Sequence, residues 1–467
     1  MKKTLVALSL VVASQSLLAY TGDNDPKYIV PNGTHKLKNM PLNAELSADK
    51  TPWASSFFPH VYGGIAFRWN NFYKGVPSFA TLHYQVDDIN AEIEELKTHL
   101  FDADLSSNQV NDMISKIQSL ESDKLSVNNE KAKDYKRYFF DIKRPDSLAD
   151  IRAMSQEERD QLSAAEKYDI YIALMTGKKL NMRLTKDVLD LTGPYKAYWE
   201  GICNGWSSAA IEFKEPQPIS YAANGIKINF NSSDLKALLS YYHASITRNW
   251  RTAKKNMTSR VGERCKDPFP KEAWFIKDGK EYYKEIVNGK TVVKAVSPEC
   301  QDTNAGAFHI VMTNMLGLQS TGFVAEMVRD KEVWNQPVYK YTSKIKDLSE
   351  AYVMKTPGTV KQVEVETELF YANDGGRMFW RHDGSDDEFY AWAEKTNGTS
   401  NYRSASKTMK YILDLDRAGN IIGGHWLSYE RPDFLWVKRS RGFLGTGFLY
   451  GIVGYMDNLK NLVELQE

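Results

Sequence analysis

The chain has 467 residues, of which 42% are hydrophobic and 25% are charged, and its formal net charge is +1. At about 150 residues per domain, this length predicts two to three domains, and the composition is that of an ordinary globular protein. A nearly neutral chain without a basic domain excludes nucleic acid as an expected partner. The aromatic content of 12% favours a large core with aromatic-lined grooves.

The first 19 residues have the pattern of a secretory signal peptide. Lys2 and Lys3 precede an apolar run at residues 5–13, which is too short to span a bilayer. Cleavage is expected after Ser16 or Ala19, and no later run has the length and apolarity of a transmembrane anchor. We therefore expect an exported protein, either periplasmic or secreted.

A pair of helices is expected early in the mature chain. Ile89, Ile93 and Leu96 recur at helical spacing, and the apolar pattern resumes after a break at 102–108. This predicts an αα-hairpin at 87–125. The hairpin is interpreted first as a solvated packing arm and second as a cover for a cleft.

The middle of the chain alternates helices with short strands. A capping pattern opens a helix at Ser155, and the segment from Ser163 leads into another helix. Residues 226–230 alternate as a strand, and a further helix is expected at 234–250. These elements flank the stretch that carries the first cysteine.

The last third of the chain is rich in strand signals. Strands are expected at 322–330, 333–341, 363–371, 390–394, 407–415 and 421–428. The turn at 416–420 joins the last two strands as a hairpin. Its Asp-x-Asp pattern is not a calcium loop, because Ala418 and His425 stand at ligand positions.

The three cysteines are Cys203, Cys265 and Cys300, an odd number for an exported protein. Cys265 and Cys300 flank a stretch in which turn signals separate strands at 274–296, and such a meander brings its ends together. We therefore expect a disulfide between Cys265 and Cys300, with Cα atoms about 5.5 to 6 Å apart. Cys203 is then a free thiol.

Cys203 follows a glycine turn and precedes Ser-Ser-Ala-Ala, a plausible first helical turn. A thiol at a helix N-terminus is close to the positive end of the macrodipole, which favours the nucleophilic thiolate. Trp199 and Trp206 bracket the cysteine with bulk for the wall of a cleft. The alternative is a structural cysteine packed beside two core tryptophans.

A cysteine nucleophile needs a base and a group that orients the base. Of the eight histidines, His309 is the best candidate, because it opens an apolar segment downstream of Cys203, in the order of papain-like enzymes. Asp330 and Asn335 are the candidate orienters. The alternative for Asp330 is a structural ion pair with Arg329.

Five segments resemble one family. Residues 333–338 read Val-Trp-Asn-Gln-Pro-Val, the hallmark of the oomycete-type transglutaminase elicitor family, which has Vibrio-type bacterial relatives. The cysteine stretch at 200–206 is similar to that family's cysteine motif. Further similar segments lie at 165–169, 234–242 and 431–436. The resemblance covers most of the mature chain, and the insertion at 89–125 has no counterpart in it.

The resemblance implies a protein-glutamine γ-glutamyltransferase that is calcium-dependent or calcium-assisted, with Cys203 as nucleophile. A glutamine carboxamide would be attacked, His309 would protonate the leaving ammonia, and a lysine or other primary amine would take the thioester. At the oxyanion site we expect backbone N–H groups and the Trp199 indole. Trp334, next to Asn335 in the sequence, is expected beside the cleft. Alternatives are a papain-like peptidase or peptidoglycan amidase, and a secreted peptide- or glycan-binding module. No metal ligand is assigned.

We therefore expect an α+β fold, with a papain/transglutaminase-like cysteine-enzyme core, a helical insertion and a β-rich C-terminal part. In this fold a helix carries Cys203, and the opposing sheet carries His309 with Asp330 or Asn335. The expected parts are a signal peptide at 1–19, an extended lead-in or pro-segment at 20–52, an N-terminal part at 53–145, a catalytic core at 146–359 and the β-rich part at 360–467.

Overall fold

The computed structural model describes residues 30–464 with gaps. The residues it leaves out between these limits are 31, 69–77, 101–104, 198, 246–257, 263, 266–268, 270, 278–279, 288–289, 298–299, 301–302, 330–331, 349–353, 374–403 and 439–454. The expected signal peptide, the strand at 390–394 and Asp330 lie outside the described residues. None of the described helices is long and apolar enough to cross a membrane.

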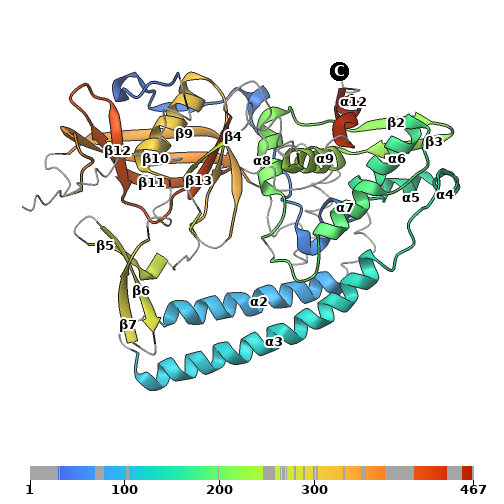
Figure 1. Cartoon of the computed structure of the whole chain (residues 1–467), viewed down its shortest axis with the longest axis horizontal. Helices are drawn as coiled ribbons and strands as arrows, with labels where there is room; N and C mark the ends of the chain where they lie inside the picture. Colours follow the sequence, from blue (N-terminus) through green and yellow to red (C-terminus); the bar gives the residue numbers. More distant parts are fainter. Residues whose placement is uncertain are drawn as a thin grey trace, which may run out of the picture.

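The chain builds a helical half and a sheet half, each with its own hydrophobic core (Figure 1). The helical half contains α4 (Leu148–Ala153), α5 (Gln156–Asp160), α6 (Ala164–Thr176), α7 (Arg183–Leu191), α8 (Cys203–Glu212), β2 (Ile219–Ala223), β3 (Ile226–Phe230), α9 (Ser232–Ser245) and α12 (Leu459–Glu464). The sheet half contains β1 (Asn43–Glu45), β4 (Thr258–Gly262), α10 (Ala305–Met312), β8 (Phe323–Glu326), β9 (Asn335–Asp347), β10 (Lys361–Ala372), β11 (Ser404–Leu415), β12 (Ile421–Trp426) and β13 (Phe434–Lys438). The mixture of helix and sheet agrees with the expectation.

The capping box predicted at Ser155 is present, and the structure shows a second one at the start of α6. The Ser163 hydroxyl accepts the Glu166 N–H, and the Glu166 carboxylate accepts the Ser163 N–H. Glu166 also pairs with Arg68 at 2.6 Å, and Lys167 pairs with the buried Asp234 at 2.6 Å. The Lys167–Asp234 pair joins two of the segments that resemble the family, which gives both a structural role in holding α6 to α9.

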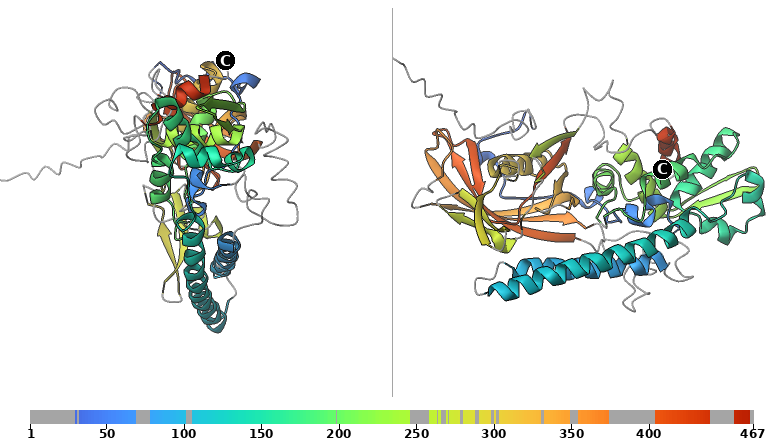
Figure 2. Two further views of the ribbon diagram at one scale, coloured as in Figure 1. Left: turned by 90° about the vertical axis from the view of Figure 1, so that its right-hand side faces the viewer. Right: turned by 60° about the horizontal axis from the view of Figure 1, so that its bottom comes forward.

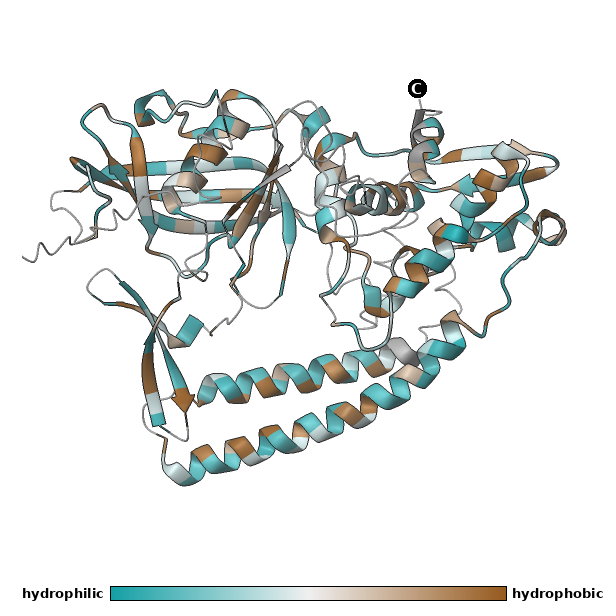
Figure 3. Ribbon diagram, viewed as in Figure 1, coloured by the Kyte–Doolittle hydropathy of each residue, from teal (hydrophilic) through white to brown (hydrophobic). Residues whose placement is uncertain are grey.

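The helical hairpin is longer than its apolar pattern predicted. It consists of α2 (Ser78–His99) and α3 (Ser107–Phe139), which lie side by side. The pair reaches toward the sheet formed by β5 (Trp274–Lys277), β6 (Lys280–Val287) and β7 (Lys290–Ala295) (Figures 1 and 2). Apolar and polar residues alternate along it, as Figure 3 shows. Lys116 of α3 pairs with Glu92 of α2 at 2.6 Å. A contact between Lys131 of α3 and His83 of α2, at 3.3 Å, lies outside the predicted range 87–125.

Among the described residues, eight strands form one antiparallel sheet in the order β12-β11-β10-β9-β8-β13-β4, with β1 beside β9. The strands β9 and β10 are neighbours, with Ser343 opposite Thr367. The expected boundary at residue 360 therefore falls between two strands of one sheet. The hairpin turn between β11 and β12 is found where the sequence placed it.

We call residues 43–58 the N-terminal arm. This segment is bonded to the sheet half and to the helical half. In the sheet half, β1 pairs with β9, with Glu45 opposite Lys340. In the helical half, the Phe57 carbonyl accepts the Ile202 N–H at 2.8 Å, and the Trp53 carbonyl accepts an indole N–H from α8. The arm is thus hydrogen-bonded to both halves.

A disulfide-bonded meander forms the third sheet, β5 (Trp274–Lys277), β6 (Lys280–Val287) and β7 (Lys290–Ala295). Cys265 and Cys300 are bonded, as predicted, with Cα atoms 4.2 Å apart, closer than expected. Arg329 ties the meander to the large sheet, since its Nη2 donates to the Cys300 carbonyl at 2.6 Å and to Glu281 at 3.2 Å. Cys203 is free.

Candidate active site

Cys203 is the first residue of α8, as the glycine before it suggested. A Cβ on Gly201 would lie 2.4 Å from the Phe57 carbonyl oxygen, so only glycine lets the chain approach the N-terminal arm here. Gly205 allows a second close approach, because a Cβ there would lie 2.1 Å from the Ser240 carbonyl oxygen of α9. These two close approaches of the backbone fix the position of the Cys203 thiol. Cys203 is only 5% exposed.

Asn335, the first residue of β9, lies against the sulfur. Its Nδ2 donates to Cys203 Sγ at 3.5 Å, and the thiol donates to the Val333 carbonyl at 3.4 Å. The structure therefore joins Cys203 to the segment 333–338 across 132 positions of the chain. Asn335 contacts the sulfur itself, whereas the sequence analysis expected it to orient a histidine.

Two residues that the sequence analysis did not single out complete this contact. Trp436 Nε1 of β13 donates to Asn335 Oδ1 at 3.1 Å. The buried Glu326 of β8 lies opposite Asn335, and its Oε1 accepts the N–H groups of Val328 and Trp334, each at 3.1 Å. The only signal for Trp436 was its place in the family-like segment 431–436, and Glu326 carried no signal.

The three tryptophans expected at the cleft have different surroundings. Trp334 packs its ring edge-on against Phe57, with centroids 5.0 Å apart, and so covers the region beside the thiol. Trp206 is fully buried and donates to the Trp53 carbonyl at 3.2 Å, which makes it a core residue rather than a cleft wall. Trp199 is half-buried, with the Arg264 guanidinium 5.2 Å from its ring. Its role as an oxyanion donor stays a prediction.

His309 lies on α10, not on the sheet as expected. Asn304 caps this helix, whose residues are all buried, and a short apolar run of this kind does not distinguish a helix from a strand. The His309 Nδ1 is hydrogen-bonded to the Tyr411 hydroxyl at 2.8 Å, which in turn meets Thr367 at 2.8 Å. Among the described hydrogen bonds none joins His309 to Cys203, so the structure places the imidazole in the sheet core.

Burial lowers the pKa of His309 to about 3. An unfolded histidine has a pKa of about 6.5, so between these values the unfolded chain binds a proton that the folded chain does not. Stability is therefore expected to fall as the pH falls below about 6.5. The slope of the unfolding free energy against pH, from urea titrations at pH 4.5 to 7, should be shallower in His309→Gln by at most about one proton. Equal slopes in both proteins would contradict the buried neutral imidazole.

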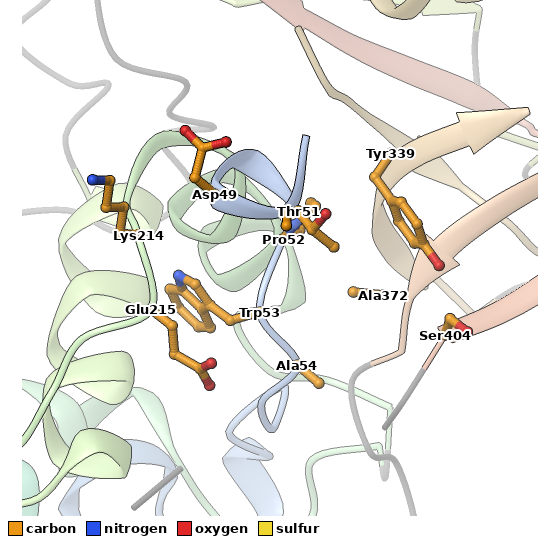
Figure 4. Close-up of a pocket in the computed structure, with 11 residues that line it drawn as sticks. Asp49, Thr51, Pro52, Trp53, Ala54, Lys214, Glu215, Tyr339, Ala372 and Ser404 are labelled. Atoms are coloured by element: carbon orange, nitrogen blue, oxygen red, sulfur yellow. The ribbon is translucent and has the colours of Figure 1, made fainter. Parts of the chain in front are cut away.

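A pocket of about 250 Å³ lies near the end of α8 that is remote from Cys203 (Figure 4). Trp53, Glu215 and Tyr339 are among its lining residues, and Cys203 is not. Glu215 is already paired with the buried Lys236. The pocket is thus separate from the thiol site.

Cys203, which lies outside the disulfide, thus stands at the start of a helix and contacts an asparagine of the opposing sheet. The sequence model of the family described as Transglutaminase elicitor matches residues 292–466. This match confirms the resemblance carried by residues 333–338. It includes Asn335 and Trp436, and Cys203 lies before it.

Among solved structures, the chain is similar to the GP42 transglutaminase from Phytophthora sojae, with 21% sequence identity and a TM-score of 0.44. The similarity covers 96% of this chain and 99% of that one. No curated protein matches the chain.

Proposed function

We propose that this protein is a protein-glutamine γ-glutamyltransferase with Cys203 as its nucleophile. The observation that carries the proposal is the contact between Cys203, the one cysteine outside the disulfide, and Asn335. Asn335 belongs to the segment that resembles the transglutaminase elicitor family and lies inside the region that the family model matches. An amide N–H donor at the sulfur stabilises a thiolate more than a neutral thiol, which favours a nucleophile at this position.

The proposed reaction is the acyl transfer that the family resemblance implies. The Cys203 sulfur attacks the carboxamide carbon of a protein glutamine, forming a thioester. The thiol proton leaves with the amide nitrogen as ammonia. A primary amine, such as a lysine side chain, then attacks the thioester carbon, which forms the isopeptide bond and returns the proton to the sulfur. The N-terminus of α8 favours the thiolate through the helix dipole.

Burial of the thiol bears on the choice of acceptor. Cys203 is 5% exposed and Asn335 is 3% exposed, so bulk water is kept from the sulfur. A thioester formed there is protected from hydrolysis, which favours an amine as acceptor over water. A glutamine side chain must reach this buried sulfur, and the ring contact between Trp334 and Phe57 lies beside Gly201, two positions before the cysteine.

The disulfide supports an exported protein, because such bonds persist in oxidising compartments. We therefore place the protein in the periplasm or outside the cell, with a protein glutamine donor and an amine acceptor as partners. For the calcium that the family resemblance implies, the described residues contain no group of three or more His, Cys, Asp or Glu that could hold a metal ion. No residue is assigned to calcium, and no step uses it.

The burial of Cys203 is also what the binding-module alternative predicts, and one assay separates the two. Wild-type protein is mixed with a glutamine-rich protein and a labelled primary amine, and covalent label and released ammonia are measured. A transglutaminase releases ammonia and incorporates label. Ammonia without label indicates an amidase, with water as acceptor. Neither product, from folded protein, would favour a binding module.

A further inference from the structure

We propose that Trp436 is a positioning residue for Cys203. In this inference the indole N–H holds the side-chain amide of Asn335 in the one orientation that directs an N–H group at the sulfur. The inference deepens the proposed function and rests on it for its role in catalysis.

The hydrogen bonds determine the orientation of the amide. An indole nitrogen can only donate, so the Asn335 atom that faces Trp436 Nε1 at 3.1 Å must be the acceptor, Oδ1. Nδ2 then faces Cys203 Sγ at 3.5 Å. The reversed amide would set two N–H groups against each other and turn its oxygen toward the sulfur, where it would repel a thiolate. Trp436 therefore decides whether Asn335 favours or opposes the charge.

The sheet brings the two side chains together across one strand. In the pairing of β13 with β8, Trp436 lies opposite Val324. In the pairing of β8 with β9, Asn335 lies opposite Glu326. Val324 and Glu326 are two positions apart, so their side chains and those opposite them lie on one face of the sheet. This face includes the Asn335 amide, which contacts α8 through Cys203.

The indole has little freedom to turn away. Its ring packs edge-on against Phe434 of the same strand, with centroids 5.8 Å apart. The guanidinium of Arg260, on the neighbouring strand β4, lies 4.9 Å from the Phe434 ring. Trp436 is only half-buried, and its ring is held by the contact with Phe434 and the hydrogen bond to Asn335 Oδ1. A donor held in this way needs no reorganisation when charge develops on the sulfur.

The test uses Trp436→Phe, which keeps an aromatic ring and removes the N–H. The rate of Cys203 alkylation by iodoacetamide is measured from pH 5 to pH 10 in full-length folded protein. Without the indole donor the amide loses its orientation, and the apparent pKa of the thiol is expected to rise by about one unit. At neutral pH this is a roughly tenfold slower alkylation, with the rate recovered at high pH.

The matched control is Trp426→Phe. Trp426 Nε1 donates to the Thr303 carbonyl at 2.7 Å, so this variant loses an indole hydrogen bond in the same sheet, away from Asn335. Its alkylation profile should match the wild type, even if its melting temperature falls. In an Asn335→Ala background, Trp436→Phe should cause no further shift, because the residue through which it acts is gone.

Three outcomes would overturn the inference: an unshifted profile in Trp436→Phe, an equal shift in Trp426→Phe, or additive effects of Trp436→Phe and Asn335→Ala. Alkylation needs no glutamine substrate, so its result is separate from that of the amine assay. A wild type that incorporates no amine but shows the Trp436-dependent shift would refute the proposed function and leave the positioning role intact. In an active protein, Trp436→Phe should lower kcat more than it changes KM.

Discussion

Cys203→Ser is expected to abolish amine incorporation, with a loss of at least about 10³-fold, as is typical when a nucleophile is removed. At neutral pH a serine hydroxyl is far less ionised than a thiol, so neither the helix dipole nor Asn335 makes it an effective nucleophile. The fold should persist, because the hydroxyl can make the same contact with the Val333 carbonyl that the thiol makes at 3.4 Å. The measurement is the initial rate of label incorporation.

The control is the melting temperature of the same preparation, which should stay within a few degrees of the wild type. Cys203→Ala, which leaves both hydrogen-bond partners of the sulfur without a polar atom, should be equally inactive but less stable. A folded Cys203→Ser protein with the wild-type rate would rule out acyl transfer through this thiol.

The second large effect is expected from the disulfide. Cys265 and Cys300 are 35 positions apart, and closing a loop of that length stabilises a folded protein by about 3 to 4 kcal/mol. The double variant Cys265→Ser/Cys300→Ser should therefore lose stability of this order in urea unfolding. The loss should extend to the large sheet, because Arg329 donates to the Cys300 carbonyl.

Dithiothreitol supplies the matched comparison. It should lower the unfolding midpoint of the wild type and of Cys203→Ser alike, and it should leave the double variant unchanged. A wild-type midpoint that does not respond to the reductant, with reduction verified by thiol titration, would show that the bridge carries none of this stability.

Local signals predicted much of this structure. The capping at Ser155, the alternating strands and the hairpin turn at 416–420 depend on residues close in sequence, and the described strands overlap the predicted ranges outside 390–394. The pairing of Cys265 with Cys300 followed from the meander between them. The position of Cys203 followed from a glycine and the small residues around it.

What the sequence did not predict depends on strand order. Trp436 and Asn335 are 101 positions apart, and they meet only because β13 and β9 flank β8. Glu326 reaches the site through the same pairing. His309 was misplaced for a different reason: a short apolar run around a histidine is compatible with a catalytic strand and with a buried helix. Its hydrogen bond to Tyr411 shows that the helix holds it in the core.

The N-terminal arm affects whether the two halves of the protein unfold together. The two hydrophobic cores would be able to melt separately if a free linker joined them. The arm instead contributes strand β1 to the sheet half and main-chain carbonyl acceptors to the helical half. Ile202, the residue before Cys203, donates to one of these carbonyls, that of Phe57. Unfolding of either half removes partners from the other, so we infer a single cooperative transition. Protease cleavage ahead of the arm should spare this cooperativity, whereas cleavage within it should broaden the transition and leave the contact between Cys203 and Asn335 as a remaining link between the halves.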